Sequence, residues 1–194
     1  MHKSSHVVPK DLSSLPADLP VPEDDGAARH LPGRSLPSLA LPATDGSVVD
    51  LAALEGRTVV FAYPAMGRPG EQSPGGDAAW DAIPGARGCT PQACAIRDRH
   101  GRFAALGARV VGLSSQTPAR QAEAVERLQL PYPLLSDSEL LLTRALELPT
   151  FEAAGHTFLK RLTLFVRDGA VEHVQYPVFP PDGSAQAALD WLGG

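Results

Sequence analysis

Residues 88–98 read GCTPQACAIRD and contain both cysteines of the chain, Cys89 and Cys94. The segment before them, residues 65–88, is crowded with Gly and Pro, which interrupt helices and strands. Past Cys89 the apolar residues recur at helical spacing, and this pattern predicts a helix that runs to about residue 106. The stretch therefore marks the point where a Gly-rich loop enters a helix.

The start of this predicted helix carries its own signals. Pro91 lies in the first turn, where proline is tolerated because the N–H that it lacks has no helical partner. Thr90 is available as the N-cap. Gly101 weakens the far end, because glycine is a poor helix former.

On both sides of this stretch, the sequence pattern predicts strands and helices that alternate. Residues 58–63 (TVVFAY) form a continuous apolar, β-rich run, typical of a buried central strand. Further patterns predict strands at 108–113, 133–135, 161–166 and 171–176, and helices at 118–128, 138–146 and 184–192. The Asp168-Gly169 step predicts a hairpin between the last two strands. This order predicts an α/β fold whose largely parallel central sheet is made mixed by the hairpin and is flanked by helices on both faces.

The chain divides into three kinds of segment. Residues 1–35 are rich in Pro, Ser, Asp and Gly and predict an irregular N-terminal arm. Residues 36–194 are expected to form one domain, with a Gly/Pro-rich insert at about 67–83. The N-terminus shows no signal-peptide pattern, so a cytoplasmic, reducing location is expected.

Composition argues against several functional classes. Apolar residues make up 43% and charged residues 20%, as in ordinary globular proteins. The formal net charge is −5, and Lys and Arg form no cluster that would hold nucleic acid or an anionic membrane. We therefore expect neither nucleic acid nor membrane as a partner.

The position of Cys89 favours a reactive thiolate. Unpaired N–H groups and the dipole of a helix stabilise negative charge at the helix N-terminus. Arg87, two residues earlier, can add positive charge. A thiolate can attack the O–O bond of a peroxide and become a sulfenic acid, which a second thiol such as Cys94 converts into a disulfide.

Forming that disulfide requires the helix to change. Five residues of α-helix separate two Cα atoms by about 8–9 Å, whereas a disulfide needs less than about 7 Å. The first helical turn must therefore unwind when Cys89 and Cys94 join, and Gly88 with the Gly-rich loop before it lowers the cost of unwinding.

The same residues resemble a known family. GCTPQACAIRD is similar to the active-site helix of the atypical two-cysteine peroxiredoxins of the Q type, also called bacterioferritin-comigratory proteins. The resemblance continues through residues 58–64, 132–137 (YPLLSD) and 161–165 (RLTLF), and covers about residues 36–192. It implies a thioredoxin-like fold of the peroxiredoxin type, and reduction of hydrogen peroxide or organic hydroperoxides by electrons from thioredoxin or a similar dithiol.

The resemblance also implies residue roles. It makes Cys89 the peroxidatic cysteine and Cys94 the resolving cysteine. It places Arg161 where the family arginine stabilises the thiolate and the developing charge on the peroxide. No cofactor and no metal are expected, and the chain is expected to be a monomer or a weak homodimer.

The sequence departs from the family in two places. The family usually carries Thr or Ser three residues before the peroxidatic cysteine, and Ala86 stands there in this chain. Backbone N–H groups or Thr90 are candidates to replace the missing hydroxyl. The loop between strand and helix is also expanded by the insert, which we expect to narrow the mouth of the active site.

Two other functions remain open from the residues. One is a thiol–disulfide oxidoreductase without peroxidase activity, although its usual motif is Cys-x-x-Cys. The other is a copper- or zinc-binding assembly factor on a thioredoxin scaffold, for which His156 or His173 would have to join the two cysteines.

Overall fold

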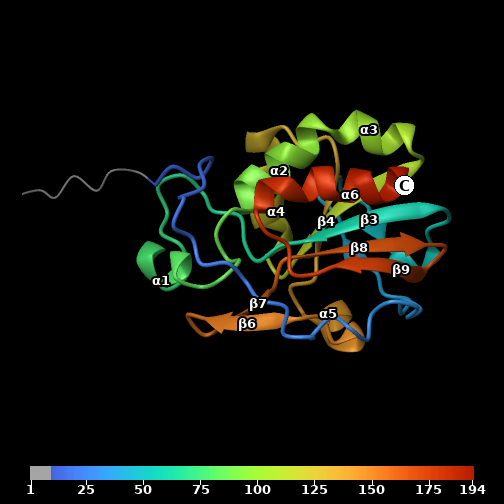
Figure 1. The fold of residues 1–194 in the computed structure, drawn as a ribbon, viewed down its shortest axis with the longest axis horizontal. Coiled ribbons are helices and arrows are strands. Elements are labelled where there is room, and N and C mark those ends of the chain that lie inside the picture. The colour runs from blue at the N-terminus through green and yellow to red at the C-terminus, as the bar shows by residue number, and fades with distance from the viewer. Residues whose placement is uncertain (1–9) are drawn as a thin grey trace, which may run out of the picture.

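A five-stranded sheet with the order β5-β4-β3-β8-β9 forms the centre of the molecule (Figure 1). The computed structural model describes residues 10–194, so the first nine residues of the predicted arm lie outside the described residues. The strands are β3 (Arg57–Ala62), β4 (Ala108–Ser114), β5 (Leu134–Ser136), β8 (Leu162–Arg167) and β9 (Ala170–Gln175). The pairs β3–β4 and β4–β5 are parallel, whereas β3–β8 and β8–β9 are antiparallel. The expected mixed α/β sheet is confirmed, but it is not largely parallel, because β8 pairs with the central strand β3 in antiparallel orientation.

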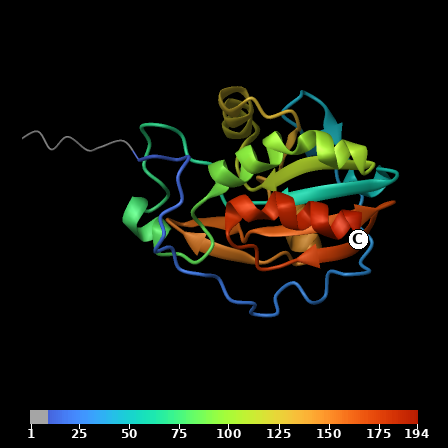
Figure 2. The ribbon, with the colours of Figure 1, turned by 45° about the horizontal axis from the view of Figure 1, so that its top comes forward.

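Helices and short strands surround this sheet. The helices are α1 (Asp77–Asp81), α2 (Cys89–Asp98), α3 (His100–Ala105), α4 (Pro118–Leu128), α5 (Leu141–Leu146) and α6 (Ser184–Gly193), with 3-10 turns η1 (Leu51–Ala53) and η2 (Pro181–Gly183). Two small hairpins are formed by β1 (Leu41–Pro42) with β2 (Val48–Val49), and by β6 (Thr150–Ala153) with β7 (His156–Leu159). In Figures 1 and 2, α2, α3 and α6 lie over one face of the sheet.

The alternation of side chains along β3 explains the two layers, because successive residues of a strand point to opposite faces. Val59 and Phe61 belong to a core cluster with residues of α2, α3 and α6. Val60 and Ala62 belong to a second cluster, with residues of α5 and of the N-terminal segment. Every one of these four side chains is almost fully buried, which identifies β3 as the central strand that the sequence predicted.

The N-terminal segment packs on the domain although residues 10–40 contain no helix or named strand. Leu31 is fully buried in the core cluster under α5. Asp25 accepts hydrogen bonds from Lys160 Nζ at 2.9 Å and from the Tyr176 hydroxyl at 2.8 Å. Its hydrogen bonds to Lys160, to the Ala27 N–H and to Tyr176 hold the pKa of Asp25 well below its usual range. The segment is therefore tied to the link between β7 and β8 and to the residue that follows β9.

Two local predictions about this helix are wrong. The single helix expected from Cys89 to about Leu106 is two helices, which separate at Arg99, where an i→i+3 hydrogen bond runs from the Arg99 N–H to Ile96. Thr90 is not the N-cap. Gly88 takes that place in a left-handed conformation with φ 110°, which non-glycine residues rarely adopt.

The hairpin β6–β7 was not foreseen at all. It turns at residues 154 and 155, both of which have positive φ. Its Phe151 and Phe158 pair across the strands and pack on Trp80, with ring centroids 5.7 and 5.1 Å from the Trp80 ring. No helix within residues 10–194 has the length and apolar character needed to cross a membrane.

Candidate active site

Cys89 is the first residue of α2 and is only 4% exposed. Both Cys89 and Cys94 are free thiols, and Cys94 is the more exposed of the two. The helix entry is shaped by Gly88, because a Cβ added there would lie 2.6 Å from Pro181 Cγ and 2.8 Å from Leu15 Cδ2. Only glycine fits this close approach, so the sequence step Gly-Cys fixes where the thiol enters the fold.

Arg161 lies directly against this thiol. Its Nη2 group donates to Cys89 Sγ at 3.2 Å, and the side chain is only 3% exposed. The same nitrogen lies 3.3 to 3.4 Å from the carbonyl oxygens of Gly85, Ala86 and Arg87. The structure therefore brings together Arg161 and Cys89, which lie 72 positions apart in the sequence.

Gln92 completes the contact, and the sequence analysis missed it. Its Oε1 accepts a hydrogen bond from Arg161 Nη1, and its Nε2 donates to Ser184 Oγ at 3.1 Å. The side chain is 2% exposed and lies one turn after Cys89 on α2. The i, i+3 spacing from Cys89 was the available signal, because residues at that spacing share a helix face.

Ala86 stands where the family usually has Thr or Ser, and it contributes apolar packing and a backbone carbonyl in place of a side-chain hydroxyl. It is fully buried in an aromatic cluster with Trp80 and Phe158. Its carbonyl oxygen lies 3.8 Å from Cys89 Sγ and 3.3 Å from Arg161 Nη2. The residue thus supplies a packing surface and a backbone acceptor at the site.

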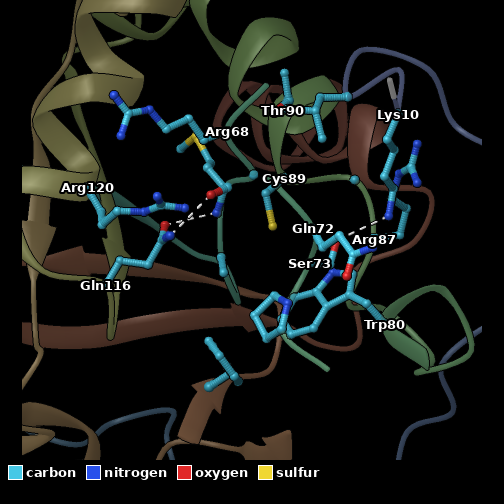
Figure 3. A pocket seen from close by; sticks show the side chains of 17 residues that line it. Lys10, Arg68, Gln72, Ser73, Trp80, Arg87, Cys89, Thr90, Gln116 and Arg120 are labelled. Atoms are coloured by element: carbon cyan, nitrogen blue, oxygen red, sulfur yellow. Dashed lines mark hydrogen bonds between the residues drawn. The ribbon is translucent and has the colours of Figure 1, made fainter. Parts of the chain in front are cut away.

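A pocket of about 210 Å³ opens over Cys89. In Figure 3 the sulfur points into the middle of the pocket, with Gln116 and Arg120 on one side and Ser73 and Trp80 on the other. Its walls are formed by Lys10, Leu12, Ala65, Met66, Gly67, Arg68, Gln72, Ser73, Pro74, Trp80, Arg87, Gly88, Thr90, Gln116, Arg120 and Phe158. Several of these belong to the insert, and two belong to the N-terminal segment.

Gln116 fixes the wall that follows β3. Its Oε1 accepts from the Met66 N–H at 2.9 Å, and its Nε2 donates to the Met66 carbonyl at 3.1 Å. The paired hydrogen bonds hold the backbone of Met66 as a strand neighbour would. This part of the pocket wall is therefore held in place where the chain leaves β3.

The charged side chains that line the pocket are all basic: Lys10, Arg68, Arg87 and Arg120. Arg120 is paired with Glu71 at 2.5 Å, and Arg87 with Asp81 at 3.0 Å. Behind the thiol the surroundings are apolar, and burial raises the pKa of Tyr63, so this phenol stays protonated. Lys10 and Arg68 are paired with carboxylates as well, so Arg161 is the cation that contacts the Cys89 sulfur directly.

Cys94 lies on the same continuous helix, five residues after Cys89. A helix of ideal dimensions holds the two Cα atoms about 8–9 Å apart, beyond the reach of a disulfide. The structure therefore describes the folded, reduced form of the pair, and a bond between them requires the first turn of α2 to open.

The histidines named for a metal site lie elsewhere. His173 stacks on Trp191 with ring centroids 4.6 Å apart, and His156 begins β7 at the surface. Within residues 10–194, no three His, Cys, Asp or Glu side chains form a group that could hold a metal ion.

Residues 31–189 match the Redoxin family. The chain is 29% identical over 189 residues to the chloroplastic peroxiredoxin Q of Gentiana triflora, covering 94% of this chain and 78% of that protein. It is 27% identical over 165 residues to peroxiredoxin Bcp of Escherichia coli, covering 82% of this chain and 94% of that protein. The crystal structure of peroxidoxin BcpB from Mycobacterium tuberculosis superposes with a TM-score of 0.65 at 28% identity, covering 84% of this chain and 96% of that one.

Proposed function

The chain belongs to the redoxin family, among relatives that are peroxiredoxins of the Q and Bcp type, and we propose that its Cys89 thiolate reduces hydroperoxides. The protein is a thiol-dependent peroxidase, for which the family implies a hydroperoxide substrate and a thioredoxin-like reductant.

In the first step the Cys89 sulfur attacks one oxygen of the peroxide. The O–O bond breaks, the sulfur becomes a sulfenic acid, and the second oxygen takes up a proton and leaves as water or alcohol. Arg161 stabilises the thiolate through Nη2, which lies 3.2 Å from the sulfur. A guanidinium suits this position because it stays charged and offers several donors in a fixed plane.

In the second step the Cys94 thiol attacks the Cys89 sulfenic acid. An S–S bond forms, the S–O bond breaks, and water leaves. The first turn of α2 unwinds to bring the two sulfurs together, because the folded helix keeps them too far apart. A thioredoxin-like dithiol then reduces the disulfide by thiol–disulfide exchange and restores the helix.

One observation carries these assignments. A buried arginine donates to a buried thiol at the base of an open pocket, although the two residues come from distant parts of the chain. A structural cysteine has no need of a cation, whereas an attacking thiolate does.

The deciding experiment is stopped-flow oxidation of the reduced protein by hydrogen peroxide and by cumene hydroperoxide. Wild type is expected to react rapidly and to give a Cys89–Cys94 disulfide in mass spectrometry. Cys89→Ser is expected not to react, and Cys94→Ser is expected to stop at the sulfenic acid, which dimedone labels. Oxidation of wild type no faster than that of a free thiol would contradict the proposal.

The segments around the domain have proposed roles as well. Residues 36–194 form the peroxidase domain, which follows the irregular N-terminal arm expected for residues 1–35. The insert at 67–83 narrows the pocket mouth, to which it contributes Gln72 and Ser73. Replacing the insert with a short Gly/Ser loop is expected to change the ratio of the rates with cumene hydroperoxide and hydrogen peroxide. An unchanged ratio in a variant with native circular dichroism would contradict the role of the insert.

The chain acts as a monomer or a weak homodimer. The large apolar residues that are exposed among those described are Val21, Val48, Leu106, Leu141 and Phe179. Sedimentation velocity of the reduced protein tests this expectation, and a stable higher oligomer would contradict it.

A further inference from the structure

Residues 10–15, here called the strap, cross the active site although they lie outside the part of the chain that matches the Redoxin family. Lys10 and Leu12 of the strap line the pocket over Cys89. Lys10 Nζ donates to Asp81 at 2.8 Å, to Asp77 at 3.2 Å and to the Ser73 hydroxyl at 3.2 Å. Its side chain is only 12% exposed. The strap is therefore anchored to the insert at its start.

The strap also holds the two residues that precede the reactive cysteine. Arg87 Nη2 donates to the carbonyl oxygen of Asp11 at 2.7 Å and to that of Ser14 at 3.3 Å. Leu15 packs on Gly88 so closely that a Cβ on this glycine would lie 2.8 Å from Leu15 Cδ2. Because Gly88 is the N-cap of α2, Leu15 of the strap packs directly against the start of the helix that carries Cys89.

The contact between Leu15 and Gly88 affects formation of the disulfide, an inference that rests on the proposed function. The bond between Cys89 and Cys94 forms only after the first turn of α2 unwinds. Unwinding moves Gly88, and the half-buried Leu15 then loses its packing partner. The contact between Leu15 and Gly88 thus stabilises the folded turn relative to the unwound one.

We propose that Leu15 is a positioning residue for the peroxidase reaction, acting through Gly88. It holds Cys89 at the base of the pocket, where the thiolate meets the peroxide, and it must be released before Cys94 can attack the sulfenic acid. The strap therefore sets the lifetime of the sulfenic acid. A longer lifetime gives a second peroxide molecule time to oxidise the Cys89 sulfenic acid to the sulfinic acid. The sulfinic acid does not react with Cys94 to form the disulfide.

The test compares Leu15→Ala with wild type in the full-length chain. The reduced protein is mixed with one equivalent of hydrogen peroxide, and samples quenched over time are analysed by mass spectrometry for sulfenic acid, captured with dimedone, and for disulfide. The loss of apolar contact is expected to speed disulfide formation about tenfold, equivalent to about 1.4 kcal/mol. With excess peroxide, the fraction of Cys89 found as sulfinic acid is expected to fall in the same variant.

Leu39→Ala is the matched control. Leu39 is a half-buried leucine of the N-terminal segment that packs on the core cluster under α5, so this variant loses a similar contact without touching Gly88. It is expected to form the disulfide at the wild-type rate, whereas a structural loosening of the whole chain would accelerate both variants.

The outcomes separate the two proposals. Wild type that forms a disulfide, with no acceleration in Leu15→Ala or equal acceleration in Leu39→Ala, would overturn the role of Leu15 and leave the peroxidase assignment intact. Wild type that forms no Cys89–Cys94 disulfide at all would overturn both. Faster disulfide formation in Leu15→Ala, with the wild-type rate in Leu39→Ala, is the result that a merely structural role of Leu15 would not produce.

Discussion

Replacing Arg161 with methionine removes the donor to the reactive sulfur while keeping a long apolar stem in the buried site. The guanidinium donates to Cys89 Sγ at 3.2 Å, to Gln92 Oε1 and to three backbone carbonyls. Only the first of these acts on the attacking sulfur directly. The effect on the attack step can therefore be worked from a single interaction.

A hydrogen bond to a charged group contributes about 1.5–3 kcal/mol, and each 1.36 kcal/mol changes a rate about tenfold. Because Arg161 and Cys89 are both almost fully buried, water cannot fully replace the guanidinium as a hydrogen-bond donor to the sulfur. Arg161→Met is therefore expected to slow peroxide attack by about tenfold to a hundredfold. The rate of peroxide attack by Arg161→Lys is expected to lie between those of the parent protein and Arg161→Met, because lysine keeps the charge but lacks the planar set of donors.

The assay is stopped-flow measurement of the second-order rate constant with hydrogen peroxide, carried out in a Cys94→Ser background. In that background the reaction ends at the sulfenic acid, so only the attack step is observed. Because the carbonyl oxygens of residues 85–87 lose a partner, near-ultraviolet circular dichroism and thermal unfolding must accompany the kinetics.

A rate constant within threefold of the parent, in a variant that keeps its native circular dichroism, would refute the assigned role. Arg161 would then be a structural residue that ties β8 to the loop before α2. A loss of rate that tracks a loss of folded protein would point to the same conclusion.

Three further predictions follow from single contacts. Gln92→Leu leaves Arg161 Nη1 without its acceptor and is expected to slow peroxide attack about threefold to tenfold, measured in the same assay. Gly169→Ala is expected to destabilise the protein by about 2–4 kcal/mol in urea unfolding, because φ there is 77° and the new Cβ would lie 2.4 Å from a carbonyl oxygen of η1. Burial against Trp191 lowers the pKa of His173, with Glu172 opposing the shift. The unfolded chain therefore binds the proton more tightly, and stability is expected to be complete above about pH 6.5 and to fall as the pH drops below it. His173→Gln should flatten the dependence of Tm on pH in this window, and an unchanged profile would count against this cause.

Some local structure was predictable because neighbouring residues decide it. The helix α4 spans Pro118–Leu128 as predicted, with Thr117 accepting a hydrogen bond from the Arg120 N–H as its N-cap. The hairpin at Asp168-Gly169 also forms, since both residues adopt the positive φ that such a turn needs.

The hairpin β6–β7 was missed although its signals were present. Gly155 supplies a positive φ, and Phe151 and Phe158 are directly opposed across the strands. The short run is stabilised by packing of its aromatic residues on Trp80, which comes from the insert about 70 residues earlier. Such support from a distant segment cannot be read from the local pattern.

The sequence alone determined the position of Cys89 at a helix start, the spacing to Cys94 and the alternation of strands and helices, because these depend on residues close together in the chain. Arg161 alone would have passed for an ordinary charge at a strand start, and only its resemblance to a family position marked it. Tertiary structure decided that its guanidinium reaches Cys89, that Gln92 holds it, and that Leu15 covers Gly88. These contacts join residues far apart in sequence or depend on how a helix is rotated against the sheet. They exist only after the chain has closed on itself and buried both core clusters.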